Sequence, residues 1–407
     1  MRKAIFIAFL TFLASLTFAQ STIGFVFQSN QPRVKIPFTL INNLVIIPVT
    51  VNNTITLKFI LDTGANNPIL TEKVFGDVMG LKYDRQILID VPGIADSITA
   101  YVASDVSLSL PQGVHGRHFS ILVLEEDYIE LKKNLGEEIY GIIGYEIFSR
   151  FVVEINYDSQ EITLYDPARF KPRKKYHAFR ISLENTKPYI NSVITQKDMT
   201  DTMKLMVDIG ASHALLLDID ESKVLTRPDS LLETSLGHGL GGEIPGKIGR
   251  LSEFQMGYYE IENLLVSIPD PGAYSNSIKR GSRHGTIGGS LMKRLNPIFD
   301  YHNGYIYLKK GKYFREPFNY DMSGLRIAYL EDPDRIKVTA VADNSPAKEA
   351  GIEVGDIILS INGRNILDHR LSEVYGELRS RENKKIRIQL ERNDQRMQFE
   401  FHLRKMI

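Results

Sequence analysis

Two acidic residues lie in matching loops that the chain contains twice. The first loop is Asp62-Thr63-Gly64-Ala65 and the second is Asp208-Ile209-Gly210-Ala211, and a strand-like apolar segment precedes each of them. A shorter strand pattern ends later in each copy at a glycine, Gly144 and Gly288. The acids are 146 residues apart and the closing glycines are 144 residues apart, so the sequence contains a duplicated unit of about this length.

The duplication extends beyond these motifs. Residues 141–165 align without gaps on residues 285–309, and both segments end in an alternating apolar strand pattern. A period of this length indicates two domain-sized halves, because the repeats of solenoid proteins are only a few tens of residues long.

Two carboxylates that such loops bring together can activate a water molecule. The glycine two residues after each acid allows the two backbones to approach closely. Like charges about 3 Å apart cannot both ionise, so the pair holds one proton and one carboxylate is free to act as a base. This base takes a proton from a water held between the acids, while the protonated partner polarises the carbonyl under attack. The chemistry requires neither a metal ion nor another cofactor.

On these motifs, residues 39–309 resemble a retropepsin-like aspartic peptidase in its single-chain, two-lobed form. The resemblance implies that Asp62 and Asp208 are a catalytic dyad, that a monomer is complete, and that peptides or proteins are the substrates. It also implies a flap over the cleft from each lobe. Residues implied to support the dyad are Thr63, Gly64, Ala65, Gly144, Gly210, Ala211 and Gly288. Flap candidates, chosen by position and glycine content, are Gly93, Gly239, Gly241 and Gly242.

The second loop departs from the family pattern at Ile209. The family places Thr or Ser after each acid, and this hydroxyl hydrogen-bonds the opposite loop; Thr63 fits the pattern and Ile209 does not. A buried backbone group that loses such a partner costs about 1–3 kcal/mol. Two interpretations stay open: an active endopeptidase with asymmetric support for its acids, and an inactive relative that holds extended peptides. The presence of both acids favours the endopeptidase.

A second pattern occupies the C-terminal part of the chain. Residues 344–352 (NSPAKEAGI) and 354–363 (VGDIILSING) closely resemble the signature of bacterial PDZ domains. The resemblance implies a domain at residues 318–407 that binds a peptide C-terminus as an added strand, with backbone N–H groups of a loop holding the carboxylate. By position, this loop is Ser323–Arg326, and Leu371–Arg379 is the helix across the groove. The predicted groove residues are Gly324, Leu325, Arg326, Ile327 and Leu371.

Other reactive side chains are weaker candidates. Ser290 follows two glycines, but no strand-to-helix elbow with a second flanking glycine follows it, and the duplication accounts for the glycines. His115 and His118 have a spacing that a metal could use, but the sequence offers no clear third ligand. His213 and His238 lie near the second acid and the flap candidate, where they could contact substrate. The simpler interpretation is that they are polar residues of the surface.

The N-terminus predicts export. Arg2-Lys3 precedes an apolar run from Ala4 to Phe18, and Ala19 ends a plausible cleavage site, which together indicate a signal peptide at residues 1–19. The chain has no cysteine, so no disulfide is available. A formal net charge of zero gives no indication of nucleic acid as a partner. We therefore expect a periplasmic or secreted protein.

The predicted fold is mostly β. Its expected parts are a first pepsin-like or retropepsin-like β-barrel lobe at residues 20–170, a second lobe at 171–312 and a PDZ domain, itself a small β-barrel with helices. Basic linkers at residues 167–175 and 309–317 separate them. Alternating apolar residues predict strands within residues 39–51 and 178–194, and short helices are expected after the acids and at residues 126–135.

Overall fold

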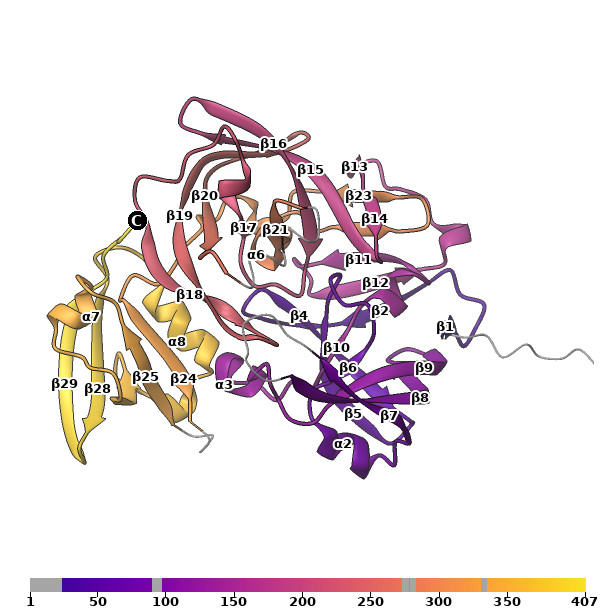
Figure 1. Cartoon of the computed structure of the whole chain (residues 1–407), viewed down its shortest axis with the longest axis horizontal. Coiled ribbons are helices and arrows are strands. Elements are labelled where there is room, and N and C mark those ends of the chain that lie inside the picture. Colours follow the sequence, from indigo (N-terminus) through magenta and orange to yellow (C-terminus); the bar gives the residue numbers. More distant parts are fainter. Residues whose placement is uncertain (1–23, 90–96, 273–277, 279–282, 331–334) are drawn as a thin grey trace, which may run out of the picture.

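Most of the chain is folded into strands, arranged as two β-rich lobes with a third domain at one side (Figure 1). This computed structural model describes residues 24–89, 97–272, 278, 283–330 and 335–407. It confirms the mostly β class. The expected signal peptide and the first flap candidate, Gly93, lie outside the described residues. Among the described residues, no helix is both long and apolar enough to cross a membrane.

The first lobe is built around a nine-stranded sheet. Its strands are β1 (Gly24–Phe27), β3 (Thr39–Ile41), β4 (Leu44–Val51), β5 (Ile55–Leu61), β6 (Ile69–Leu70), β7 (Tyr83–Ile89), β8 (Ile98–Leu110), β9 (Val114–Leu124) and β10 (Gly141–Ile143). Short helices α2 (Lys73–Val78), α3 (Leu131–Leu135) and α4 (Tyr145–Phe148) accompany them. Strand β10 pairs parallel with β5 and antiparallel with β6, which brings two distant segments of the chain together.

The second lobe repeats this arrangement in an eight-stranded sheet. Its strands are β14 (Ser182–Glu184), β15 (Lys187–Gln196), β16 (Met199–Asp208), β17 (Leu215–Leu217), β18 (Leu232–Gly239), β19 (Gly242–Met256), β20 (Tyr259–Pro269) and β21 (Gly285–Gly288), and α6 (Gly289–Met292) follows. Strand β21 pairs parallel with β16 and antiparallel with β17, as β10 does with its two neighbours. The duplication read from the sequence is therefore a structural duplication.

A six-stranded sheet joins the lobes. One half supplies β2 (Arg33–Pro37), β11 (Val152–Asn156) and β12 (Glu161–Tyr165), and the other supplies β13 (His177–Arg180), β22 (Ile298–Asp300) and β23 (Tyr305–Leu308). The halves meet where β11 pairs antiparallel with β22. In this pairing, Val153 lies opposite Phe299 and Glu154 lies opposite Ile298. One apolar core runs through both lobes, so the lobes form a single packed body.

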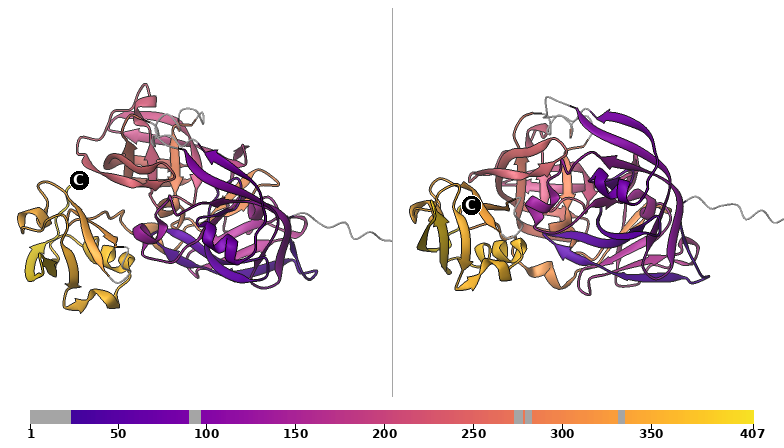
Figure 2. Two further views of the ribbon diagram at one scale, coloured as in Figure 1. Left: turned by 60° about the horizontal axis from the view of Figure 1, so that its bottom comes forward. Right: turned by 90° about the horizontal axis from the view of Figure 1, so that it is seen from below.

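The C-terminal domain has a core of its own and lies beside the lobes (Figure 2). Its elements are β24 (Leu325–Tyr329), β25 (Ile336–Val341), β26 (Ile357–Ile361), β27 (Arg364–Asn365), β28 (Lys385–Arg392), β29 (Gln395–His402), α7 (Pro346–Glu349) and α8 (Leu371–Leu378). Single turns of 3-10 helix lie at η1 (Pro167–Arg169), η2 (Ile219–Glu221), η3 (Lys312–Arg315) and η4 (Ile366–Asp368). Phe318 packs in the core of the lobes, although the sequence assigned it to the PDZ domain.

Candidate active site

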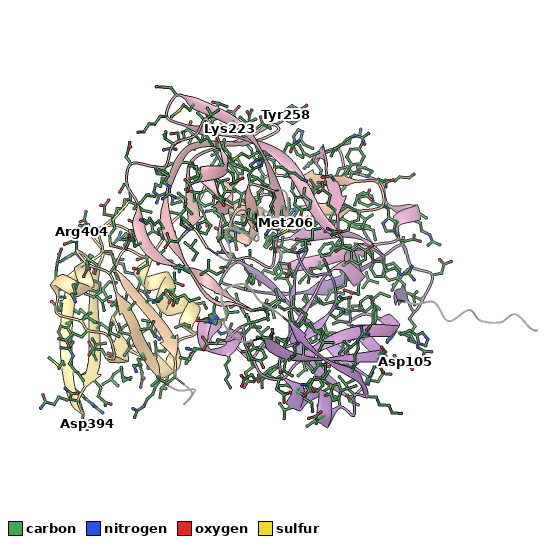
Figure 3. The ribbon with its side chains drawn as sticks, viewed as in Figure 1. Asp105, Met206, Lys223, Tyr258, Asp394 and Arg404 are labelled. Atoms are coloured by element: carbon green, nitrogen blue, oxygen red, sulfur yellow. The ribbon has the colours of Figure 1, made fainter. Side chains whose placement is uncertain are left out.

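Each acid lies at the end of a strand in the middle of its lobe's sheet. Asp62 follows β5 and Asp208 is the last residue of β16. A parallel partner strand, β10 or β21, pairs with the strand that leads to each acid. Met206, two residues before the second acid, lies near the middle of the molecule in Figure 3. The two loops meet between the lobes, where Gly210 lies against Asp62 and Gly64 lies against Asp208.

Glycine allows the loops to touch. A Cβ atom at Gly210 would lie 2.2 Å from Cγ of Asp62, and one at Gly64 would lie 3.0 Å from Oδ2 of Asp208. The N–H group of Gly64 donates to Oδ1 of Asp62 (2.5 Å), and that of Gly210 donates to Oδ1 of Asp208 (2.9 Å). The structure thus brings together the two acids and both of these predicted glycines.

The first acid has a strongly perturbed titration. Burial is the largest cause that raises the pKa of Asp62 well above its usual value, followed by the charge of Asp208 and a hydrogen bond with it. The N–H group of Gly64 and the charge of Lys187 lower the pKa and oppose this shift. A raised pKa beside a second carboxylate is the behaviour of two acids that share one proton.

A single hydroxyl crosses between the loops. Oγ1 of Thr63 donates to the carbonyl oxygen of Val207 (2.7 Å) and accepts from the N–H group of Ile209 (3.1 Å). The side chain of Ile209 is fully buried in the common core and has no hydroxyl with which to return the contact. The support is asymmetric, as the sequence indicated.

The closing glycines lie where a side chain has no room. A Cβ atom at Gly144 would lie 1.8 Å from the carbonyl oxygen of Asp62, and one at Gly288 would lie 2.2 Å from that of His213. The carbonyl groups of Ala65 and Ala211 accept hydrogen bonds from the segments that follow these glycines (3.3 and 2.7 Å). These residues fix the loops that carry the acids.

Two turns that the sequence did not single out also clamp the loops. Nδ2 of Asn43 donates to the carbonyl oxygen of Ser212 in the second loop (3.0 Å). Oγ1 of Thr186 donates to Oδ1 of Asn66 beside the first loop (2.6 Å). The turn Asn42-Asn43 between β3 and β4 corresponds to the turn Asn185-Thr186 between β14 and β15, and all four residues have a positive φ. The duplication thus places an asparagine-containing turn at the same point of each half, a signal that could have identified both turns.

The second flap candidate forms a hairpin tip. Gly239 pairs with Gly242 across the turn between β18 and β19, and Gly241 lies in the turn itself. Leu240 at this tip packs against an apolar cluster of the first lobe. Nε2 of His238 lies 3.6 Å from Oε2 of Glu130 in the first lobe. The hairpin therefore reaches from one lobe to the other.

The predicted PDZ groove residues gather between β24 and α8. Gly324 has a φ of +82°, and a Cβ atom there would lie 2.1 Å from Cβ of Ser345, so the turn before β24 requires glycine. Leu325, Ile327 and Leu371 are buried in the core of the domain. Arg326 forms an ion pair with Glu243 of the second lobe's hairpin.

Comparison with known proteins supports both parts of this architecture. Residues 47–147 match the family model described as aspartyl protease, and residues 337–392 match a PDZ domain model. A protein of Staphylococcus saprophyticus named "Probable CtpA-like serine protease" is 20% identical over 206 residues, which are 51% of this chain and 40% of that protein. A protein of the same name from Staphylococcus aureus strain COL is 29% identical over 101 residues, 25% of this chain and 20% of that protein.

These two relatives are matched over less than half of their own length. The aspartyl protease match contains Asp62 and Gly144, and the internal duplication extends the same loop and strand arrangement to Asp208 and Gly288. The chain thus combines a retropepsin-like aspartyl protease domain with a C-terminal PDZ domain.

Proposed function

We propose that this chain is an aspartic endopeptidase in which Asp62 and Asp208 activate a water for attack on a peptide bond. The observation that carries the proposal is the contact of the two acid loops together with the raised pKa of Asp62 beside Asp208. With one proton on the pair, the ionised carboxylate takes a proton from the water and the other acid polarises the scissile carbonyl. Proton return to the leaving nitrogen completes the cleavage.

Ile209 favours a second candidate function, a peptide-binding protein that does not cleave. Thr63 holds the loop of Asp208, but Ile209 has no hydroxyl that could hold the loop of Asp62 in return. Catalytic geometry tolerates displacements of only about 0.5 Å. The turn of Thr186 offsets this loss, because its hydroxyl hydrogen-bonds Asn66 beside the loop of Asp62. We therefore favour the active enzyme.

The name of the relatives raises serine chemistry as a third possibility. Ser109 and His115 are hydrogen-bonded (2.9 Å), but they lie on the neighbouring strands β8 and β9, where His115 is exposed and Ser109 is half-buried. Within the described ranges, His115 has no carboxylate partner to orient it. A serine nucleophile needs a base that is itself oriented by a third group, so this pair offers a poor basis for catalysis.

Exposure of the purified protein to a diverse peptide library tests the proposal. We expect new peptide termini from the natural protein, read by mass spectrometry, and none from Asp62→Asn or Asp208→Asn. Ser109→Ala and Ser290→Ala are the matched controls and should retain cleavage. Cleavage that survives both aspartate changes but not a serine change would replace the aspartic mechanism. A lack of cleavage by the natural protein, combined with peptide binding, would establish the second candidate.

The remaining expectations follow from the domain content. We propose that the PDZ domain binds peptide C-termini, that the peptidase acts as a monomer and that it works after export. Export predicts a mature protein that begins at Gln20, which N-terminal sequencing of a cell-envelope fraction would show.

A further inference from the structure

The groove of the PDZ domain lies against the first lobe. Helix α3 contacts β24, and Figure 1 shows it beside β24 and α8. At Gly136, which ends α3, an added Cβ atom would lie 2.1 Å from a ring carbon of Tyr329 and 2.8 Å from Cβ of Leu371. These two residues belong to the strand and the helix that border the groove. The first lobe therefore covers one end of the groove without space for another methyl group.

The N–H and carbonyl groups of Ile327 on β24 already have a partner within the domain. Strand β24 is at the edge of its sheet, where an added peptide strand would pair. The hydroxyl of Tyr375 on α8 donates to the carbonyl oxygen of Ile327 (2.8 Å) and accepts from its N–H group (3.2 Å). A peptide that pairs with Ile327 must displace this hydroxyl.

The loop predicted to bind the terminal carboxylate of a peptide already binds a side-chain carboxylate of its own chain, that of Asp321. Asp321 accepts hydrogen bonds from the N–H groups of Ser323 (3.2 Å) and Gly324 (2.6 Å). The N–H group of Leu325 donates to the hydroxyl of Ser323 (3.0 Å). Three successive donors of this loop are therefore satisfied internally.

Ion pairs connect the covered groove to the catalytic lobes. Glu137, next to Gly136, lies 3.5 Å from Arg370 at the start of α8 and 2.9 Å from Lys58 on β5, the strand that leads to Asp62. Arg326 pairs with Glu243 in the hairpin that reaches between the lobes. A cleft of about 250 Å³ between α8 and the lobes is lined by Tyr375 and also by Asn43, whose amide holds the loop of Asp208.

We propose that this groove is a docking surface for residues 131–137 of the same chain, and that a peptide C-terminus enters it only by displacing this segment. On entry, the peptide backbone replaces the Tyr375 hydroxyl as the hydrogen-bond partner of Ile327. Entry also separates Arg326 from Glu243. The PDZ domain then no longer holds the hairpin of the second lobe through this ion pair. Occupancy of the groove therefore changes the position of the hairpin over the catalytic cleft. This last consequence rests on the proposed peptidase function, whereas the docking itself does not.

A matched pair of glycine substitutions tests the docking in the full chain. Gly136 (φ +69°) and Gly80 (φ +66°) both require left-handed backbone, but a Cβ atom at Gly80 would meet nothing within 4 Å. Both alanine variants therefore carry the same backbone strain, and only Gly136→Ala inserts a methyl group between the lobe and the PDZ domain. We expect amide hydrogen exchange in residues 325–329 to rise about tenfold or more in Gly136→Ala, because overpacking weakens a contact by that order. Equal exchange in the two variants would overturn the docking.

Peptide binding tests the competition. The probes are a fluorescent nonapeptide library with free C-terminal carboxylates and the same library as C-terminal amides. We expect Gly136→Ala to bind the acids about tenfold more tightly than Gly80→Ala does, with no such gain for the amides. Equal affinity of the two variants for the acids, or no binding by either, would overturn the proposal.

The link to the hairpin is tested by charge reversal. Arg326→Glu should change the turnover of short peptides, and the double variant Arg326→Glu with Glu243→Arg should restore it. If the natural protein cleaves and neither change alters turnover, the release of the hairpin is wrong. If the natural protein cleaves nothing, the proposed function fails, while exchange and peptide binding still decide the docking.

Discussion

At the scale of single residues, the two acid loops differ in the residue after the acid. Thr63 holds the opposite backbone at both Val207 and Ile209, and Ile209 instead fills the core. One loop thus supplies polar contact and the other supplies apolar packing. The acids themselves retain matching hydrogen bonds from Gly64 and Gly210. The two loops therefore differ in the contacts of the residue after the acid, whereas the hydrogen bonds of the acids themselves match.

Asp62→Asn and Asp208→Asn should each lower cleavage by at least about a thousandfold, because the acids act as one unit.

The charge state of Asp62 also makes stability depend on pH. The folded-state pKa of Asp62 is raised, so the protonated carboxyl stabilises the fold fully below the unfolded value near 3.9, and this stabilisation is lost as pH rises through the folded value. Asp62→Asn replaces the carboxyl group by an amide that stays neutral at pH 7. The substitution should therefore raise the melting temperature at pH 7. Melting curves at pH 4 and pH 7 measure the effect, and a lower melting temperature at pH 7 would contradict it.

Ile209→Thr tests whether a second hydroxyl would be used. Ile209→Val is the control, since valine has the shape of threonine and removes the same methylene group. A regained hydrogen bond contributes about 0.5–1.5 kcal/mol, which would balance the cost of burying the hydroxyl. We therefore expect Ile209→Thr to be at least as stable as Ile209→Val in denaturant titration. A threonine variant less stable by more than about 1 kcal/mol would show that the loop accepts only an apolar residue.

The charge of Lys187 should lower the upper pH limit of the proposed activity. Its charge lowers the pKa of Asp62, so Lys187→Gln should raise that pKa further. The dyad works with one proton and loses activity as pH rises through the upper pKa, so the alkaline limb of kcat/KM should move to higher pH. Lys187→Arg keeps the charge and should leave the limb in place. A limb that moves to lower pH in Lys187→Gln would refute this assignment.

At the scale of elements, two turns hold the acid loops from the opposite lobe. Asn43 in the turn between β3 and β4 has a φ of +68° and donates to Ser212. Thr186 in the turn between β14 and β15 donates to Asn66. The duplication places one such turn in each lobe, so each acid loop is supported from both sides of the cleft.

Substitution of Asn43 should lower kcat more than it changes KM, because the residue positions a loop and does not contact the reacting atoms. Asn43→Gly keeps the left-handed backbone accessible and removes only the amide, whereas Asn43→Ala also introduces backbone strain. We expect kcat to fall severalfold in both variants and stability to fall more in Asn43→Ala. Unchanged kcat in Asn43→Gly would show that the hydrogen bond to Ser212 does not support catalysis.

Elements were predictable where the signal is local. Alternation of apolar residues predicted the strand at β4, and the offset of the repeat predicted that the loops of Asp62 and Asp208 are equivalent. The contacts of Asn43, Glu137 and Asp321 were not predicted, because each joins segments whose proximity depends on the packed lobes or on a single turn geometry. The PDZ domain itself was predicted from its motif, whereas the hydrogen bonds between Tyr375 and Ile327 leave no trace in a sequence motif.

At the scale of the whole molecule, the chain forms two packed units, the pair of lobes and the PDZ domain. The lobes have one common core, whereas the PDZ domain has its own, so the two units are independent in their packing. They are nevertheless joined at the first lobe through Glu137 and at the second through Glu243. Arg326 and Glu243 are both exposed, and an exposed ion pair contributes only about 0–1 kcal/mol, so this second link is weak enough for a bound peptide to open.

Truncation after Asn319 should make the cleavage of short peptides faster, because it removes Arg326 and releases the hairpin of Glu243, and it should alter the turnover of larger or C-terminally tagged substrates. The dyad and both closing glycines lie upstream, and this cut keeps Phe318, whose ring lies 3.7 Å from the guanidinium of Arg294. A cut before Phe318 is the matched control and should destabilise the lobes, because it removes a side chain of their core. Melting curves separate this loss of folding from a catalytic effect. A folded product of the longer cut that no longer cleaves short peptides would show that the PDZ domain is part of the catalytic unit.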